Sequence, residues 1–118
     1  MKNFHLRSNQ DKLLRKVAIK LQTKEEKNTK ISFICTVKNE ERTIKHLLES
    51  VMSQKRSPDE VLIVDGGSTD RTVQLIRDYI DSKNLPIKLI VAPNANIAQG
   101  RNIAIRNASY EIVASTDG

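Results

Sequence analysis

The sequence has few aromatic residues, one cysteine, two histidines and no long apolar run. Aromatic residues make up 3% of its 118 residues and tryptophan is absent, so aliphatic side chains must form the core. The single cysteine, Cys35, excludes a disulfide within the chain and a cysteine-based zinc cluster. No apolar run approaches the ~18–20 residues of a membrane span, and the N-terminus lacks a signal-peptide core. These absences predict a single-domain protein in the cytoplasm.

Positive charge is concentrated at the N-terminus. Residues 1–30 hold nine Lys and Arg and three Asp and Glu, whereas residues 31–118 hold eleven of each. Apolar residues at helical spacing over 8–21, flanked by lysine and arginine, predict a basic amphipathic helix, and 24–30 reads as a linker. This helix either contacts an anionic membrane surface or packs on its own domain. A charge confined to one arm argues against a nucleic-acid partner.

From residue 31 onward, strands and helices alternate. Apolar runs predict strands over 31–36, 60–64, 87–91 and 110–116. Helical stripes predict one helix that begins at Glu40 with Asn39 as its N-cap, and further helices from 72 to 80 and from 97 to 107. Strands joined by helices imply a Rossmann-like open sheet of about four parallel strands with flanking helices.

Polar residues follow these strands at 36–41, at 65–70 and at Asp117. In open α/β sheets, ligands bind beyond the carboxyl ends of the strands, and these segments share that edge. The loop that begins at Asp65 contains two glycines, which let backbone approach a ligand closely. The Asp65 carboxylate either accepts hydrogen bonds from a base or ribose or caps the helix that follows. Asp70 is better explained as a charge at the helix start.

Several catalytic motifs are missing from the sequence. It has no dinucleotide-binding glycine fingerprint, no P-loop and no nucleophile elbow. His5 and His46 do not support a triad or a zinc site. The remaining carboxylates and backbone groups suit a hard cation, Mg²⁺ or Mn²⁺, that bridges a diphosphate.

Three segments of the chain point to a known family. In order, these are residues 35–41, residues 63–72, and residues 100–104 followed by 111–117. They closely resemble the N-terminal half of family 2 glycosyltransferases, which have the GT-A fold. The resemblance implies that residues 31–118 form the nucleotide-sugar-binding half of such an enzyme. It places Thr36, Glu40, Asp65 and Gly67 at the nucleoside and Arg101 near the diphosphate. Asp117 would be the first carboxylate of the metal motif.

The implied function is metal-assisted transfer of a sugar from a UDP- or GDP-linked donor to an acceptor, for which a lipid carrier at the inner face of the membrane is one option. The second metal carboxylate, the catalytic base and the acceptor-binding half would follow residue 118, so the chain alone is expected to bind nucleotide without turnover. Two departures stand out: Gly66 replaces a frequent second acid, and Val37-Lys38 replaces a frequent aromatic residue.

Two alternatives to the enzyme stay open. One is a non-catalytic nucleotide-binding module of the same fold. The other is a nucleotidyltransferase, which would usually carry a glycine-rich loop after the first strand. An open edge strand also predicts low stability or self-association.

Overall fold

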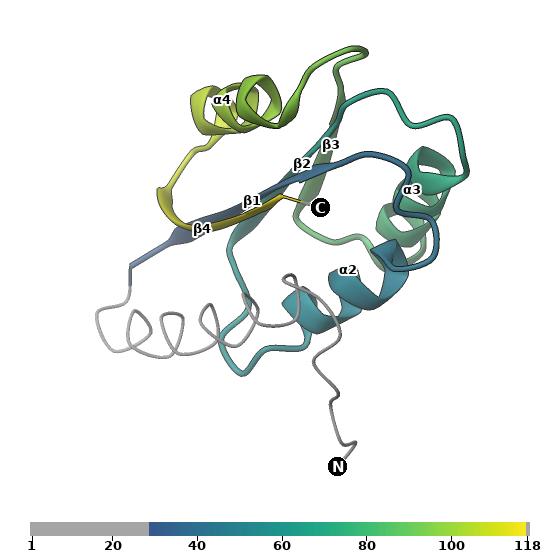
Figure 1. Cartoon of the computed structure of the whole chain (residues 1–118). Helices are drawn as coiled ribbons and strands as arrows, with labels where there is room; N and C mark the ends of the chain where they lie inside the picture. The colour runs from purple at the N-terminus through teal and green to yellow at the C-terminus, as the bar shows by residue number, and fades with distance from the viewer. Residues whose placement is uncertain (1–28, 118) are drawn as a thin grey trace.

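A parallel sheet with helices on both faces forms the structured part of the chain (Figure 1). The computed structural model describes residues 29–117, and for residues 112–117 it describes the backbone. In chain order the elements are β1 (Ile31–Val37), α2 (Ile44–Met52), β2 (Glu60–Asp65), α3 (Thr72–Lys83), β3 (Ile87–Val91), α4 (Ile97–Asn107) and β4 (Glu111–Asp117). The strand order is β3-β2-β1-β4 and every pair is parallel. The predicted four-stranded open sheet is confirmed, whereas the predicted helix over 8–21 lies outside the described residues.

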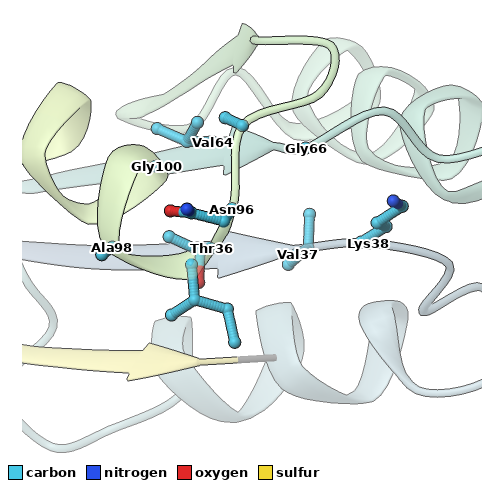
Figure 2. A pocket seen from close by; sticks show the side chains of 10 residues that line it. Thr36, Val37, Lys38, Val64, Gly66, Asn96, Ala98 and Gly100 are labelled. Carbon is cyan, nitrogen blue, oxygen red and sulfur yellow. The ribbon is translucent and has the colours of Figure 1, made fainter.

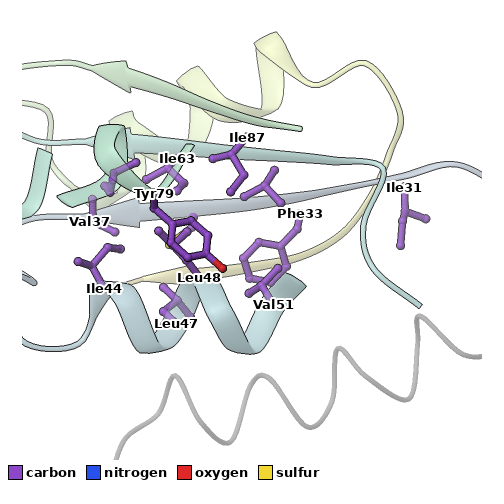
Figure 3. Close-up of a cluster of buried hydrophobic side chains, with 13 residues drawn as sticks. Ile31, Phe33, Val37, Ile44, Leu47, Leu48, Val51, Ile63, Tyr79 and Ile87 are labelled. Atoms are coloured by element: carbon purple, nitrogen blue, oxygen red, sulfur yellow. The ribbon is translucent and has the colours of Figure 1, made fainter. Parts of the chain in front are cut away.

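The main hydrophobic core lies between the sheet and the pair α2 and α3 (Figure 3). The stripe predicted for the first helix is buried there, comprising Ile44, Leu47, Leu48 and Val51. It packs against alternate residues of the two central strands, including Phe33 and Ile63. All residues of β1 and β2 are buried, as expected for parallel strands that are covered on both faces.

The opposite face of the sheet is covered by α4 through a smaller cluster. Ile34, Leu62 and Val64 of the central strands meet Ala104 of α4. Because alternate residues of a strand face opposite sides, these even-numbered positions define the α4 face of the sheet. Small residues on the inner side of α4 let this helix lie close to the strands.

The first helix begins later than the sequence pattern indicates. It starts at Ile44, not at Glu40, and a turn over residues 41–43 precedes it. Asn39 does not cap it, because Asn39 has a left-handed backbone (φ 52°) and its side chain accepts a hydrogen bond from the Thr69 N–H at 2.8 Å. A partner thirty residues away in sequence therefore outweighs the local capping pattern.

No helix within residues 29–117 is both long enough and apolar enough to cross a membrane.

Candidate functional site

A pocket of about 490 Å³ opens at the carboxyl edge of the sheet, between the ends of β1 and β2 and the beginning of α4 (Figure 2). This is the edge at which open α/β sheets bind ligands. Its lining comprises Thr36, Val37, Lys38, Val64, Gly66, Ala95, Asn96, Ile97, Ala98 and Gly100. Most of these side chains are small or apolar, and none is acidic. The pocket therefore offers small, largely apolar walls and no acidic side chain that would repel an anion.

The start of α4 forms one wall of this pocket and is held rigidly. Asn96 and Gln99 form a capping box, in which the Gln99 N–H donates to Asn96 Oδ1 at 2.7 Å and the Asn96 N–H donates to Gln99 Oε1 at 2.9 Å. Further along the helix, a Cβ placed on Gly100 would lie 3.0 Å from Thr36 Cγ2. Glycine at this position lets α4 pack directly against β1.

The hydroxyl of Thr36 is a buried polar group of the pocket without a partner among the described residues. Thr36 is 8% exposed, and its Oγ1 makes no hydrogen bond with any described residue. Leaving a buried hydroxyl without a partner costs free energy, so such groups usually meet water or a ligand. Of the residues predicted to bind the nucleotide, Thr36 is the one that lines the pocket.

Asp65 lies on the other face of the sheet edge. It pairs in register with Val37 and follows Ile63 onto the face covered by α2 and α3, whereas Thr36 lies on the α4 face. Asp65 is fully buried, and its Oδ2 accepts hydrogen bonds from the N–H groups of Gly67 (3.0 Å) and Ser68 (2.9 Å). In this structure the carboxylate shapes its own loop and does not line the pocket.

The other residues predicted to contact nucleotide lie around the pocket and do not line it. Gly67 has φ +107°, which the loop requires and which side chains rarely adopt. Glu40 is half-buried, and its carboxylate accepts from Thr43 Oγ1 at 3.0 Å. Arg101 is half-buried on α4, one residue beyond the pocket-lining Gly100. Their predicted contacts with a nucleotide stay predictions.

Asp70 was predicted as a charge in the first turn of a helix, but α3 begins at Thr72 and Asp70 precedes it by two residues. Its Oδ1 accepts from the Thr72 N–H at 2.9 Å. Burial would raise the pKa of Asp70, but the hydrogen bonds from Thr72 and from the Glu41 N–H outweigh it, so the pKa is lowered. The carboxylate therefore accepts from the first residue of α3 and from the Glu41 N–H of the loop after β1.

Asp117, the predicted metal ligand, lies in backbone register with Thr36 on the neighbouring strand. Its backbone is thus at the edge where the pocket opens. Among the side chains that the structure describes, those of residues 29–111, no group of three His, Cys, Asp or Glu is placed to hold a metal ion. A Mg²⁺ site needs several oxygen ligands, and the predicted role of Asp117 as one of them stays a prediction.

The sequence pattern missed the loop between β3 and α4 as a wall of the pocket. Ala95, Asn96 and Ile97 line it, although 93–96 reads as a plain loop. The signal was present, because Asn96 followed three residues later by Gln99 is a capping-box pattern that places the helix N-terminus there.

Comparisons with known proteins agree on one family. The family model described as glycosyl transferase family 2 matches residues 32–118. A poly-beta-1,6-N-acetyl-D-glucosamine synthase from Staphylococcus epidermidis is 35% identical over 88 residues, which are 74% of this chain and 21% of the synthase. The chain thus spans about a fifth of that relative's length.

Two solved structures share the fold. S. aureus TarS 1-349, in complex with UDP-GlcNAc, matches with a TM-score of 0.64 and 31% identity, over 75% of this chain and 26% of that one. The mannosyltransferase PcManGT from Pyrobaculum calidifontis, in complex with GDP-Man and Mn²⁺, matches with a TM-score of 0.69 and 24% identity, over 89% of this chain and 39% of that one. The second match supports the fold alone.

Proposed function

We propose, from the premise that this chain belongs to glycosyl transferase family 2, that it forms the nucleotide-sugar-binding part of a glycosyltransferase. The pocket beside Thr36 would hold the nucleoside of a UDP- or GDP-linked sugar. The unpartnered Thr36 hydroxyl is the observation that carries this proposal, because it points to a ligand that supplies the missing hydrogen bond. The complex of TarS with UDP-GlcNAc contains a ligand of this class.

The charges around the pocket fit this ligand class. No acidic side chain lines the pocket, and the exposed Lys38 stands at its rim. A nucleoside diphosphate would place its neutral base against the small apolar walls and its anionic group toward solvent. Arg101, one residue beyond the wall formed by Gly100, is proposed to lie on the diphosphate side.

Asp117 is proposed as one carboxylate of a Mg²⁺ or Mn²⁺ site. Its backbone lies beside Thr36 at the pocket edge. When bound, such an ion would offset the charge that develops on the leaving diphosphate. The sugar and its acceptor, including a lipid carrier as one option, belong to the proposed parent enzyme.

Isothermal titration calorimetry tests the proposal. The full chain is titrated with UDP, with GDP and with ADP, each with and without Mn²⁺. We expect weak binding of UDP or GDP, strengthened by Mn²⁺, and weaker binding of ADP, which controls for attraction of any diphosphate to the basic arm. The absence of binding for both UDP and GDP at millimolar concentrations would contradict the proposed function.

A further inference from the structure

Two loops that flank the pocket are fastened to each other across the sheet edge. The loop after β1 and the loop after β2 exchange hydrogen bonds centred on Asn39. The Asn39 N–H donates to Ser68 Oγ at 2.8 Å, and Asn39 Oδ1 accepts from the Thr69 N–H at 2.8 Å. Asn39 can do both because its left-handed backbone turns its N–H and its side chain toward the second loop.

The Asp65 carboxylate holds the second of these loops through three hydrogen bonds. Its Oδ1 accepts a hydrogen bond from Ser68 Oγ, and its Oδ2 accepts from the N–H groups of Gly67 and Ser68. Since the Ser68 hydroxyl has one proton and gives it to Asp65, its oxygen is left to accept from Asn39. We call the three side chains of Asp65, Ser68 and Asn39 the interloop clasp.

The interloop clasp adjoins the pocket on two sides. Lys38 precedes Asn39 in the chain, Gly66 follows Asp65, and both line the pocket. The two sides are also joined directly, because the Gly66 N–H donates to the Val37 carbonyl at 3.0 Å. Loss of hydrogen bonds in the clasp would therefore let both Lys38 and Gly66, which line the pocket, change position.

We propose that Asp65 and Ser68 are positioning residues of the nucleotide site, which act through the clasp and do not touch the nucleotide. This inference rests on the proposed function of the pocket. It is carried by the complete burial of Asp65, by its place on the face opposite Thr36, and by the hydrogen bonds that both of its oxygens already accept. A nucleoside in the pocket would meet the Gly66 backbone and not the Asp65 carboxylate.

The test compares Ser68→Ala with Ser68→Thr, which keeps a hydroxyl. The matched control is Ser82→Ala on α3, because Ser82 Oγ also makes one local hydrogen bond, to the Tyr79 carbonyl at 3.1 Å. Hydrogen exchange followed by NMR reports on the clasp. We expect the Asn39 amide to exchange about tenfold faster in Ser68→Ala and at the wild-type rate in the other two variants.

Nucleotide affinity is then measured for the same proteins with UDP and GDP. Loss of the Ser68 hydroxyl is expected to raise Kd about five- to tenfold, with Ser68→Thr and Ser82→Ala near wild type. Asn39→Gly keeps the left-handed backbone but removes the bond to Thr69, and it is expected to weaken binding in the same direction. If Ser68→Ala folds poorly, Asn39→Gly still tests whether the clasp supports nucleotide binding.

The outcomes separate the two proposals. If the wild type binds neither nucleotide, the proposed function fails and the inference falls with it. If the wild type binds while Ser68→Ala and Asn39→Gly bind equally well, the pocket function stands and the positioning role is wrong. Faster exchange at Asn39 together with weaker binding, rescued by Ser68→Thr, supports the inference.

Discussion

Two buried threonines near the site differ in one respect, namely whether the hydroxyl has a partner. Thr72 is fully buried, and its Oγ1 accepts from the Glu40 N–H at 2.8 Å and donates to Asp70 Oδ1. Thr36 Oγ1 has no partner among the described residues. The same substitution should therefore have opposite effects on stability at the two positions.

Thr36→Val is expected to leave the free energy of unfolding unchanged or raise it by up to about 1 kcal/mol, since it removes an unsatisfied hydroxyl. Thr72→Val is expected to lower it by about 1–3 kcal/mol, because the Glu40 N–H then loses its acceptor. Urea unfolding measures both changes. Thr36→Val should also weaken UDP or GDP binding about tenfold or less. A clear loss of stability in Thr36→Val would contradict the unpartnered hydroxyl.

Gly66 lies close to the backbone of the loop that precedes α4. A Cβ added there would lie 2.7 Å from the Ala95 carbonyl oxygen, whereas one added at Gly100 would lie 3.0 Å from a methyl group of Thr36. Backbone cannot yield as a side chain can. Gly66→Ala is thus expected to cost about 1–3 kcal/mol of unfolding free energy. The control Gly100→Ala should cost less, because alanine favours a helix interior by up to about 1 kcal/mol. Equal costs in urea unfolding would contradict this contact.

At the residue scale, the sequence predicted the site only in part. Thr36, predicted at the nucleoside, lines the pocket because it ends a buried strand at the ligand edge, and its contact with a nucleotide stays a prediction. Asp65 was also predicted at the nucleoside; strand alternation places it on the face of Ile63 and outside the pocket lining, and its predicted contact stays untested. Residue type alone cannot distinguish a carboxylate that binds a ligand from one that holds its own loop.

For helices and strands, the predicted bounds were most accurate where the spacing of apolar residues alone determined them. The helix over Ile97–Asn107 has the predicted bounds, and β2 and β4 differ by one residue at their ends. The start of α2 was wrong because Asn39, a good local cap, bonds to the neighbouring loop. The loops after β1 and β2 meet because their strands are neighbours in the sheet. A sequence pattern over a few residues does not reveal which strands are neighbours.

A polar network ties the elements together at the end of the sheet away from the pocket. Glu60 is 5% exposed, and its Oε1 accepts from Ser32 Oγ and from the Ser109 N–H, both at 2.8 Å. Lys88 on β3 lies 3.3 Å from Oε2. Burial would raise the pKa of Glu60, but these hydrogen bonds outweigh it and lower the pKa below its ordinary value. One carboxylate thus links β1, β2, β3 and the segment before β4.

The lowered pKa makes the contribution of Glu60 dependent on pH. A carboxylate with a lowered pKa in the folded state stabilises fully above its unfolded pKa, near 4.5, and loses that contribution as pH falls through the folded value. Glu60→Gln is expected to cost about 1–3 kcal/mol at pH 7, because an amide NH₂ replaces one acceptor oxygen. The difference between wild type and variant in urea unfolding should shrink as pH falls below 4.5. A difference that stays constant down to pH 3 would contradict the network. Asp59, whose pKa is also lowered, is present in both proteins, so its titration cancels in the comparison.

For the molecule as a whole, the described residues make a sheet with β3 and β4 as its outer strands. Such edges present backbone groups to other chains, so self-association stays a prediction. The charge of the chain is also unevenly distributed along the sequence. The positive excess of the chain lies in residues 1–30, while residues 31–118 are balanced. A membrane partner would thus be recognised by the arm, and the nucleotide by the sheet edge.

Charge reversal within the arm tests that division. Lys16→Glu with Lys20→Glu is expected to reduce binding to phosphatidylglycerol-containing vesicles at least about thirtyfold, since each basic residue near an anionic surface contributes about 1 kcal/mol. Lys55→Glu with Arg77→Glu, two exposed positions in the folded part, changes the net charge equally and should leave binding near wild type. Vesicle sedimentation measures both, and raised salt should weaken the wild-type binding. Equal losses in the two variants would mean that net charge, and not the arm, governs binding. Wild-type protein that stays in the supernatant would exclude a membrane role for the arm.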